Sequence, residues 1–225
     1  MAFSVKVCGI QTLEEAKMAA ASGADYLGFL LGLTHTAEDK TTPEAAAAMI
    51  QSLKNTASKA VMVTHLLDAE HISEIATRTG VHAIQIHDDL SDAGIRSLRT
   101  AQPSLLLIKA VHVEAHGEAD TAFKKAMHYA NMPELDVLLL DSRTTDRLGG
   151  TGKTHDWSIS RQICQTSPKP VWLAGGLKPA NVTKAVQEVS PAGVDANSGL
   201  ETLSGAKCPE KIRNFVQNAK GMKGV

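Results

Sequence analysis

The chain has 225 residues, a formal net charge of −1 and 43% apolar residues, as expected of a globular protein in water. The near-neutral charge and the lack of an apolar run approaching about 18 residues argue against nucleic acid and membrane as partners. The start shows no signal-peptide pattern, and the 3 widely spaced cysteines predict reduced thiols and a cytoplasmic location.

Short apolar runs alternate with helical patterns along the whole chain. Between the runs, apolar side chains recur with the period of 3.6 residues that is typical of helices. The runs predict eight strands, namely Ser4–Cys8, Asp25–Leu30, Lys59–Thr64, His82–Ile86, Leu105–Val111, Leu135–Leu140, Pro170–Ala174 and Val194–Ala196.

Capping residues mark where several of the helices begin. Thr12 and Glu15 have the spacing of a capping box, and a threonine precedes Pro43 at the start of the second helix. The third helix is expected to open at Asp68, and the last one at Pro209. These signals predict helices in the gaps between the strands.

Strands that are each followed by a helix predict a parallel sheet with helices covering its outside. We therefore expect an α/β protein with one (β/α)8 TIM barrel domain over residues 1–225. An open, doubly wound parallel sheet is the alternative.

Two glycine-bearing turns follow the last two predicted strands. Gly175 and Gly176 end an apolar run, and Pro179 can open a helix three residues later. Ser198 and Gly199 follow the next strand. Glycine lets the backbone approach a ligand closely, and turns at adjacent strand ends of a barrel often hold a phosphate group. The pair of turns predicts a phosphorylated small-molecule substrate.

Chemically active side chains follow other predicted strands. Cys8 ends the first strand, His87 follows the fourth and Asp141 follows the sixth. In a barrel these strand ends meet on one rim, where the active site lies. The glycine-rich loop 149–153 is interpreted as a lid that closes over substrate.

The 9 histidines do not predict a metal site. His112 and His116 are four residues apart, but they lie at a strand end and in a loop rather than on one helix. Lys109 lies near the end of the fifth strand, where some barrels place a Schiff-base lysine, yet a structural role is favoured. We expect neither a metal nor any other cofactor.

With these motifs the sequence resembles the phosphoribosylanthranilate isomerase family of tryptophan biosynthesis. No single motif is specific, but the set occurs in the family's order over almost the whole chain. The matching blocks are Val5–Ile10, Gly23–Phe29, Gln85–His87, Leu139–Ser142, Gly149–Lys153, Asp156-Trp157, Ala174–Leu177, Asn181-Val182 and Ser198–Glu201.

The resemblance implies an Amadori rearrangement, in which the aldose N-(5′-phosphoribosyl)anthranilate becomes the ketose 1-(2-carboxyphenylamino)-1-deoxyribulose 5-phosphate. It makes Cys8 the general base that removes the C2′ proton and Asp141 the general acid that protonates the ring oxygen. The resemblance also implies phosphate binding by Gly152, Gly175, Gly176, Ser198 and Gly199, and other substrate contacts by Lys6, Gln85, His87 and Lys40.

The sequence departs from the family where the anthranilate carboxylate is expected. The family's Ser-x-Arg element is missing, because residues 32–40 contain no arginine and Lys40 or His35 supplies at most a point charge. Asp88 stands where the family usually has glycine, and Val63–Leu67 differs from the Val-Phe-x-Asn type. We expect the phosphoribosyl end of the site to be retained and the anthranilate end to be altered.

Three functions stay open on the sequence alone. The first is phosphoribosylanthranilate isomerase; the second is an isomerase or epimerase for a different phosphorylated sugar. The third is a non-catalytic protein that binds a phosphorylated metabolite, against which the presence of both proton-transfer groups argues. Both a monomer and a homodimer are compatible with the sequence.

Overall fold

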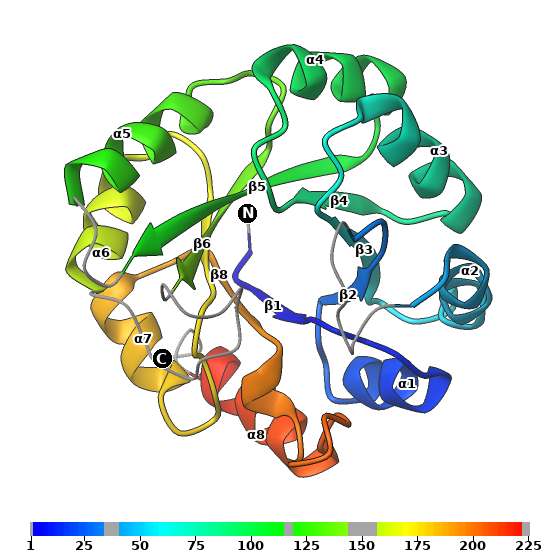
Figure 1. Ribbon diagram of the computed structural model, residues 1–225. Helices are drawn as coiled ribbons and strands as arrows, with labels where there is room; N and C mark the ends of the chain where they lie inside the picture. The colour runs from blue at the N-terminus through cyan, green and yellow to red at the C-terminus, as the bar shows by residue number, and fades with distance from the viewer. Residues whose placement is uncertain (1, 34–40, 115–118, 144–156, 222–225) are drawn as a thin grey trace.

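The computed structural model describes residues 2–33, 41–114, 119–143 and 157–221. Its strands form one closed parallel barrel in the order β1 to β8, and the helices form a ring outside it (Figure 1). This confirms the predicted (β/α)8 fold and excludes the open sheet. The strands are β1 Ser4–Val7, β2 Tyr26–Leu30, β3 Lys59–Thr64, β4 Ala83–Ile86, β5 Leu106–Glu114, β6 Val137–Arg143, β7 Val171–Leu173 and β8 Gly193–Ala196.

The helices follow the strands in strict alternation, as the sequence pattern predicts. None of those in the described ranges is long and apolar enough to cross a membrane. The helices are α1 Leu13–Ala21, α2 Pro43–Ser52, α3 Ala69–Thr79, α4 Asp92–Ala101, α5 Ala119–Ala130, α6 Trp157–Thr166, α7 Val182–Val189, the 3-10 turn η1 Ser198–Leu200 and α8 Pro209–Lys220.

The predicted caps are confirmed where the structure shows them. Thr12 accepts a hydrogen bond from the Glu15 backbone at 3.2 Å, and the Glu15 carboxylate accepts from the Thr12 backbone at 3.3 Å. Asp68 accepts from Glu70 N at 2.9 Å and so caps α3. These contacts satisfy backbone N–H groups that have no partner within the helix.

The helix after β7 begins later than Pro179, which corrects one prediction. α7 starts at Val182 with Asn181 at its N-cap. The Asn181 side chain accepts from Lys178 N at 2.8 Å and donates to Gly176 O at 3.0 Å. Because these two bonds tie the segment before α7 into a turn, Pro179 lies in that turn and not in the first turn of the helix.

Strands β5 and β6 run further than predicted. Their ladder extends from the pair Ile108 and Val137 to the pair Glu114 and Arg143. His112 and Asp141, which we expected at a strand end and just past one, therefore lie inside the ladder as direct partners.

Alternate residues of each strand fill the barrel interior, as the two-residue period of a strand requires. Trp172 is the largest of them, is fully buried and has its ring centroid 4.8 Å from that of Tyr26. Lys109 lies between the interior residues Ile108 and Ala110 on β5, so its side chain is on the outer face of the strand. There its Nζ lies 4.9 Å from the centroid of the Tyr129 ring on α5. The interior cluster consists of Cys8, Tyr26, Leu30, Val61, Val63, Ala83, Ile108, Ala110, Val137, Leu139, Trp172 and Ala174.

Replacing Trp172 with alanine empties the centre of this interior cluster. We expect the free energy of unfolding to fall by about 3–5 kcal/mol, because both apolar burial and packing are lost. Leu203→Ala is the matched control, since that side chain is exposed and its removal leaves stability unchanged. Urea unfolding followed by far-ultraviolet circular dichroism measures both. Equal midpoints for the two variants would contradict this description of the core.

Candidate active site

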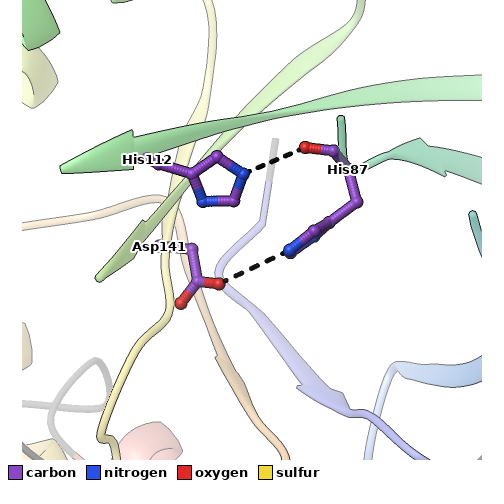
Figure 2. Close-up of side chains that lie close together, drawn as sticks. All are labelled: His87, His112 and Asp141. Atoms are coloured by element: carbon purple, nitrogen blue, oxygen red, sulfur yellow. Dashed lines mark hydrogen bonds and ion pairs between the residues drawn. The ribbon is translucent and has the colours of Figure 1, made fainter. Parts of the chain in front are cut away.

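The parity that fills the barrel interior also determines which side chains reach its mouth. On β4 and the residue after it, Ala83 and Gln85 are followed by His87, and on β6 Leu139 is followed by Asp141. Figure 2 shows His87, His112 and Asp141 converging from neighbouring strand ends. The predicted site residues of β4 and β6 are therefore brought together.

Cys8 lies beside a buried ion pair. Lys6 Nζ is 2.9 Å from Asp195 Oδ2, with the two side chains 0% and 7% exposed. The pair forms because Lys6 and Asp195 are partners in the β1–β8 register. Gly28 on β2 leaves the room for this arrangement, since a Cβ there would lie 2.8 Å from Cys8 Sγ and 3.0 Å from Lys6 Nζ.

The ion pair determines the charge next to the thiol. Burial raises the pKa of Cys8 to about 11, although the Lys6 ammonium pulls that pKa down. Burial by itself would lower the pKa of Lys6, but attraction to Asp195 and Cys8 outweighs it and the pKa of Lys6 is raised. At neutral pH Cys8 is therefore a thiol beside a permanent positive charge.

Asp141 lies next to His87 on the other side of the mouth. His87 Nε2 is 3.8 Å from Asp141 Oδ2, and these side chains are 17% and 16% exposed. His87 Nδ1 lies 3.4 Å from Gln85 Nε2, and the His87 backbone N–H donates to Thr64 O at 3.0 Å. Gln85, His87 and Asp141, all predicted as site residues, thus form one connected row.

The two glycine-bearing turns pack against each other. Gly175 and Gly176 have φ values of 82° and 65°, which only glycine adopts without strain. A Cβ on Gly199 would lie 1.9 Å from Leu177 O, so glycine is required there. Within the described part of the chain, no hydrogen bond uses the backbone N–H of Gly175 or Gly176. These N–H groups are available to an anion.

Two predicted substrate-binding residues lie outside the described residues. They are Lys40, in the segment after β2, and Gly152, in the proposed lid segment 149–153. His35 and His116 lie outside as well.

The structure also shows a row of three neighbouring imidazoles, His65, His87 and His112, which the sequence patterns did not predict. The ring centroids of His65 and His87 are 4.5 Å apart, and those of His87 and His112 are 4.8 Å apart. Asp88, expected to add negative charge to the site, has its Oδ2 3.0 Å from His65 Nδ1. Strand parity carried past each predicted strand end is the signal that would have grouped these residues.

Comparisons with known proteins identify the family of this chain. The family model "N-(5'phosphoribosyl)anthranilate (PRA) isomerase" matches residues 5–218. N-(5′-phosphoribosyl)anthranilate isomerase 2 of Methanosarcina mazei is 40% identical over 218 residues, covering 96% of this chain and 93% of that protein. The phosphoribosylanthranilate isomerase structure from Thermotoga maritima matches with a TM-score of 0.83 at 32% identity, covering 97% and 99% of the two chains.

A further solved structure contains a ligand. It is a phosphoribosylanthranilate isomerase in complex with reduced 1-(o-carboxyphenylamino)-1-deoxyribulose 5-phosphate. It matches with a TM-score of 0.78 at 30% identity, covering 97% of this chain and 99% of that one.

The ammonium next to Cys8 gives a prediction about thiol reactivity. Lys6→Met removes the group that lowers the pKa of Cys8, so the thiolate fraction falls by about tenfold for each unit that the pKa rises. We expect iodoacetamide to label Cys8 more slowly in this variant at pH 8–9, as measured by mass spectrometry of the Cys8 peptide.

The direction in which the labelling rate of Cys8 changes distinguishes an electrostatic effect of Lys6 from a loosened fold. In the unchanged protein the labelling rate should rise steadily with pH up to 10, because the pKa of Cys8 is about 11. Faster labelling of Cys8 in the Lys6→Met variant would show a loosened fold and would contradict the electrostatic role of Lys6.

Proposed function

The chain belongs to the N-(5′-phosphoribosyl)anthranilate isomerase family, and from this premise we propose how its own residues catalyse that reaction. The activity is an aldose-to-ketose isomerisation in tryptophan biosynthesis that converts N-(5′-phosphoribosyl)anthranilate into 1-(2-carboxyphenylamino)-1-deoxyribulose 5-phosphate. One observation carries the assignment of roles: the thiol of Cys8, directly after β1, and the carboxylate of Asp141, near the end of β6, lie at the same end of the closed parallel barrel as the glycine turns after β7 and β8.

Asp141 is the general acid in this proposal. It donates a proton to the furanose ring oxygen, and the C1′–O bond breaks to give the open-chain iminium form. The position of Asp141, which is 16% exposed and has Oδ2 3.8 Å from His87 Nε2, supports this role because the carboxyl is held in place yet remains accessible from the mouth. Positioned acids of this kind typically contribute about 10² to 10⁴ to the rate.

Cys8 is the general base. Its thiolate takes the proton from C2′, the electron pair moves to the iminium, and the resulting enolamine tautomerises to the ketone product. Because the pKa of Cys8 is about 11, the thiolate is a minor form at neutral pH. The Lys6 ammonium supports the proposal because it lowers the pKa of Cys8 and so increases the fraction of thiolate that can accept the C2′ proton.

The substrate phosphate is proposed to bind at the packed turns of Gly175-Gly176 and Ser198-Gly199. Two observations support this: the left-handed glycines, and N–H groups that no described residue accepts. Gly152 is proposed to complete this subsite from the lid segment.

The remaining substrate contacts are proposals that follow the family's pattern. Gln85 and His87 are proposed to line the sugar. Lys6 is fully buried, so we propose that it influences the substrate through its charge beside Cys8 and not by direct contact. Lys40 is proposed to face the anthranilate carboxylate, where it would supply a single charge in place of an arginine fork.

We further propose a single domain over residues 1–225, acting in the cytoplasm as a monomer or homodimer. The 3 cysteines are free thiols, which supports a reducing compartment.

Cys8→Ala and Asp141→Asn test the assigned roles. We expect each to lower kcat by about 10² to 10⁴, measured as the loss of anthranilate fluorescence from freshly generated substrate. Cys164→Ala on α6 is the matched control and should retain the full rate. A Cys8→Ala variant as fast as the control would remove Cys8 from the mechanism.

Gly199→Ala tests the phosphate subsite. The added Cβ would lie 1.9 Å from Leu177 O, so the two turns must move apart. We expect the KM to rise about tenfold or more, which corresponds to about 1.4 kcal/mol of lost binding. Gly221→Ala is the control, because a Cβ there meets nothing within 4 Å. An unchanged KM in Gly199→Ala would place the phosphate elsewhere.

A further inference from the structure

We propose that the barrel mouth contains a binding site for a divalent first-row transition-metal ion, with His87, His112 and Asp141 as its ligands. Each of these half-buried residues offers one ligand atom, and the three atoms lie within 4.8 Å of one another (Figure 2). Two imidazoles and one carboxylate form a donor set that suits Zn²⁺ and its neighbours better than Ca²⁺ or Mg²⁺, which prefer oxygen ligands alone.

The strands hold these ligands in place. His112 and Asp141 are direct partners in the parallel ladder of β5 and β6, and partners in such a ladder project from the same face of the sheet. His87 follows β4, whose last residue pairs with Lys109 on β5. Ligands carried by adjacent strands are held more precisely than ligands on loops.

A backbone contact selects the tautomer of His112. Its Nε2 lies 3.1 Å from His87 O. A carbonyl oxygen only accepts hydrogen bonds, so Nε2 carries the proton and, in the neutral ring, Nδ1 carries the lone pair. A ring N–H donated to a backbone carbonyl is a usual outer contact of a metal-binding histidine.

Gln85 can select the tautomer of His87 in the same way, through a hydrogen bond to its ring. Metal binding through His87 Nε2, the atom that faces Asp141, requires the proton on Nδ1. Gln85 Nε2 lies 3.4 Å from that Nδ1, while Gln85 Oε1 is buried and has no hydrogen-bond partner in the described part of the chain. Turning the amide over brings Oε1 to Nδ1–H, so that the oxygen accepts this hydrogen bond.

The ligand atoms need only small shifts to bind an ion. Bonds of about 2.0–2.1 Å in a tetrahedral site place ligand atoms about 3.3 Å apart, whereas the three atoms here lie within 4.8 Å of one another, with His87 Nε2 and Asp141 Oδ2 at 3.8 Å. Rotation of the three side chains closes the difference. The fourth position then faces the mouth, where water completes the coordination.

Occupancy of this site blocks isomerisation. A carboxylate oxygen that binds the ion cannot carry the proton that Asp141 delivers, so Zn²⁺ is a reversible inhibitor that a chelator removes. This consequence rests on the proposed function, whereas the binding of the ion does not.

Calorimetric titration of the metal-free full chain with Zn²⁺ tests the site. We expect one Zn²⁺ per chain and an affinity at least about tenfold lower in His112→Gln. Glutamine keeps an N–H donor for His87 O but has no lone pair at the Nδ1 position. His128→Gln is the matched control, because His128 contacts Asp92 at 3.1 Å outside the three-ligand group, and it should bind as the unchanged protein does.

Absence of one-to-one binding, or equal affinities of His112→Gln and the unchanged protein, would overturn the site. Titration with Co²⁺ adds a spectroscopic readout, in which a sulfur-to-cobalt charge-transfer band would place the ion on a cysteine and also overturn it. In activity assays Zn²⁺ should inhibit the unchanged protein and His128→Gln but not His112→Gln. If the unchanged protein shows no turnover, the proposed function fails while the calorimetry still decides the site.

Discussion

The buried ion pair between Lys6 and Asp195 joins the first and last strands of the barrel, and both closure and chemistry depend on it. Two charges removed from water are tolerated only when they satisfy each other, and here they lie 2.9 Å apart with almost no exposure. The pair ties β1 to β8 at the register where the sheet closes. The same ammonium lies beneath Cys8, so the contact that completes the barrel also sets the electrostatics of the proposed base.

The features of this structure that could be predicted from the sequence are those that depend on short local patterns. The eight strands, the Thr12 capping box and the start of the third helix at Asp68 are confirmed. Each depends on a short pattern: strand period, cap chemistry or strand end. The extension of β5 and β6, by contrast, comes from pairing between strands, and the later start of α7 comes from side-chain bonds of Asn181. Such contacts have no signature in a local window. The histidine row was missed for a different reason: the predicted strands end directly before His65, His87 and His112.

The retained and altered halves of the site lie on different arcs of the barrel. The ion pair, the thiol and the two glycine-bearing turns lie on or directly after β1, β7 and β8, where several of the blocks that resemble the family occur. The departures at Asp88 and His65 fall after β3 and β4, where they contact each other and adjoin the ring of His87. Both departures therefore lie in one corner of the barrel mouth, beside the His87 ring that neighbours Asp141.

The most direct test of this account is steady-state turnover of freshly generated N-(5′-phosphoribosyl)anthranilate by the unchanged, metal-free protein, followed as loss of anthranilate fluorescence. The account predicts saturable turnover, because the proposed acid, the proposed base and the proposed phosphate subsite do not depend on the family's arginine. A folded protein that binds phosphate but leaves the fluorescence unchanged would contradict it. That result would mean that the altered arc has changed the substrate itself.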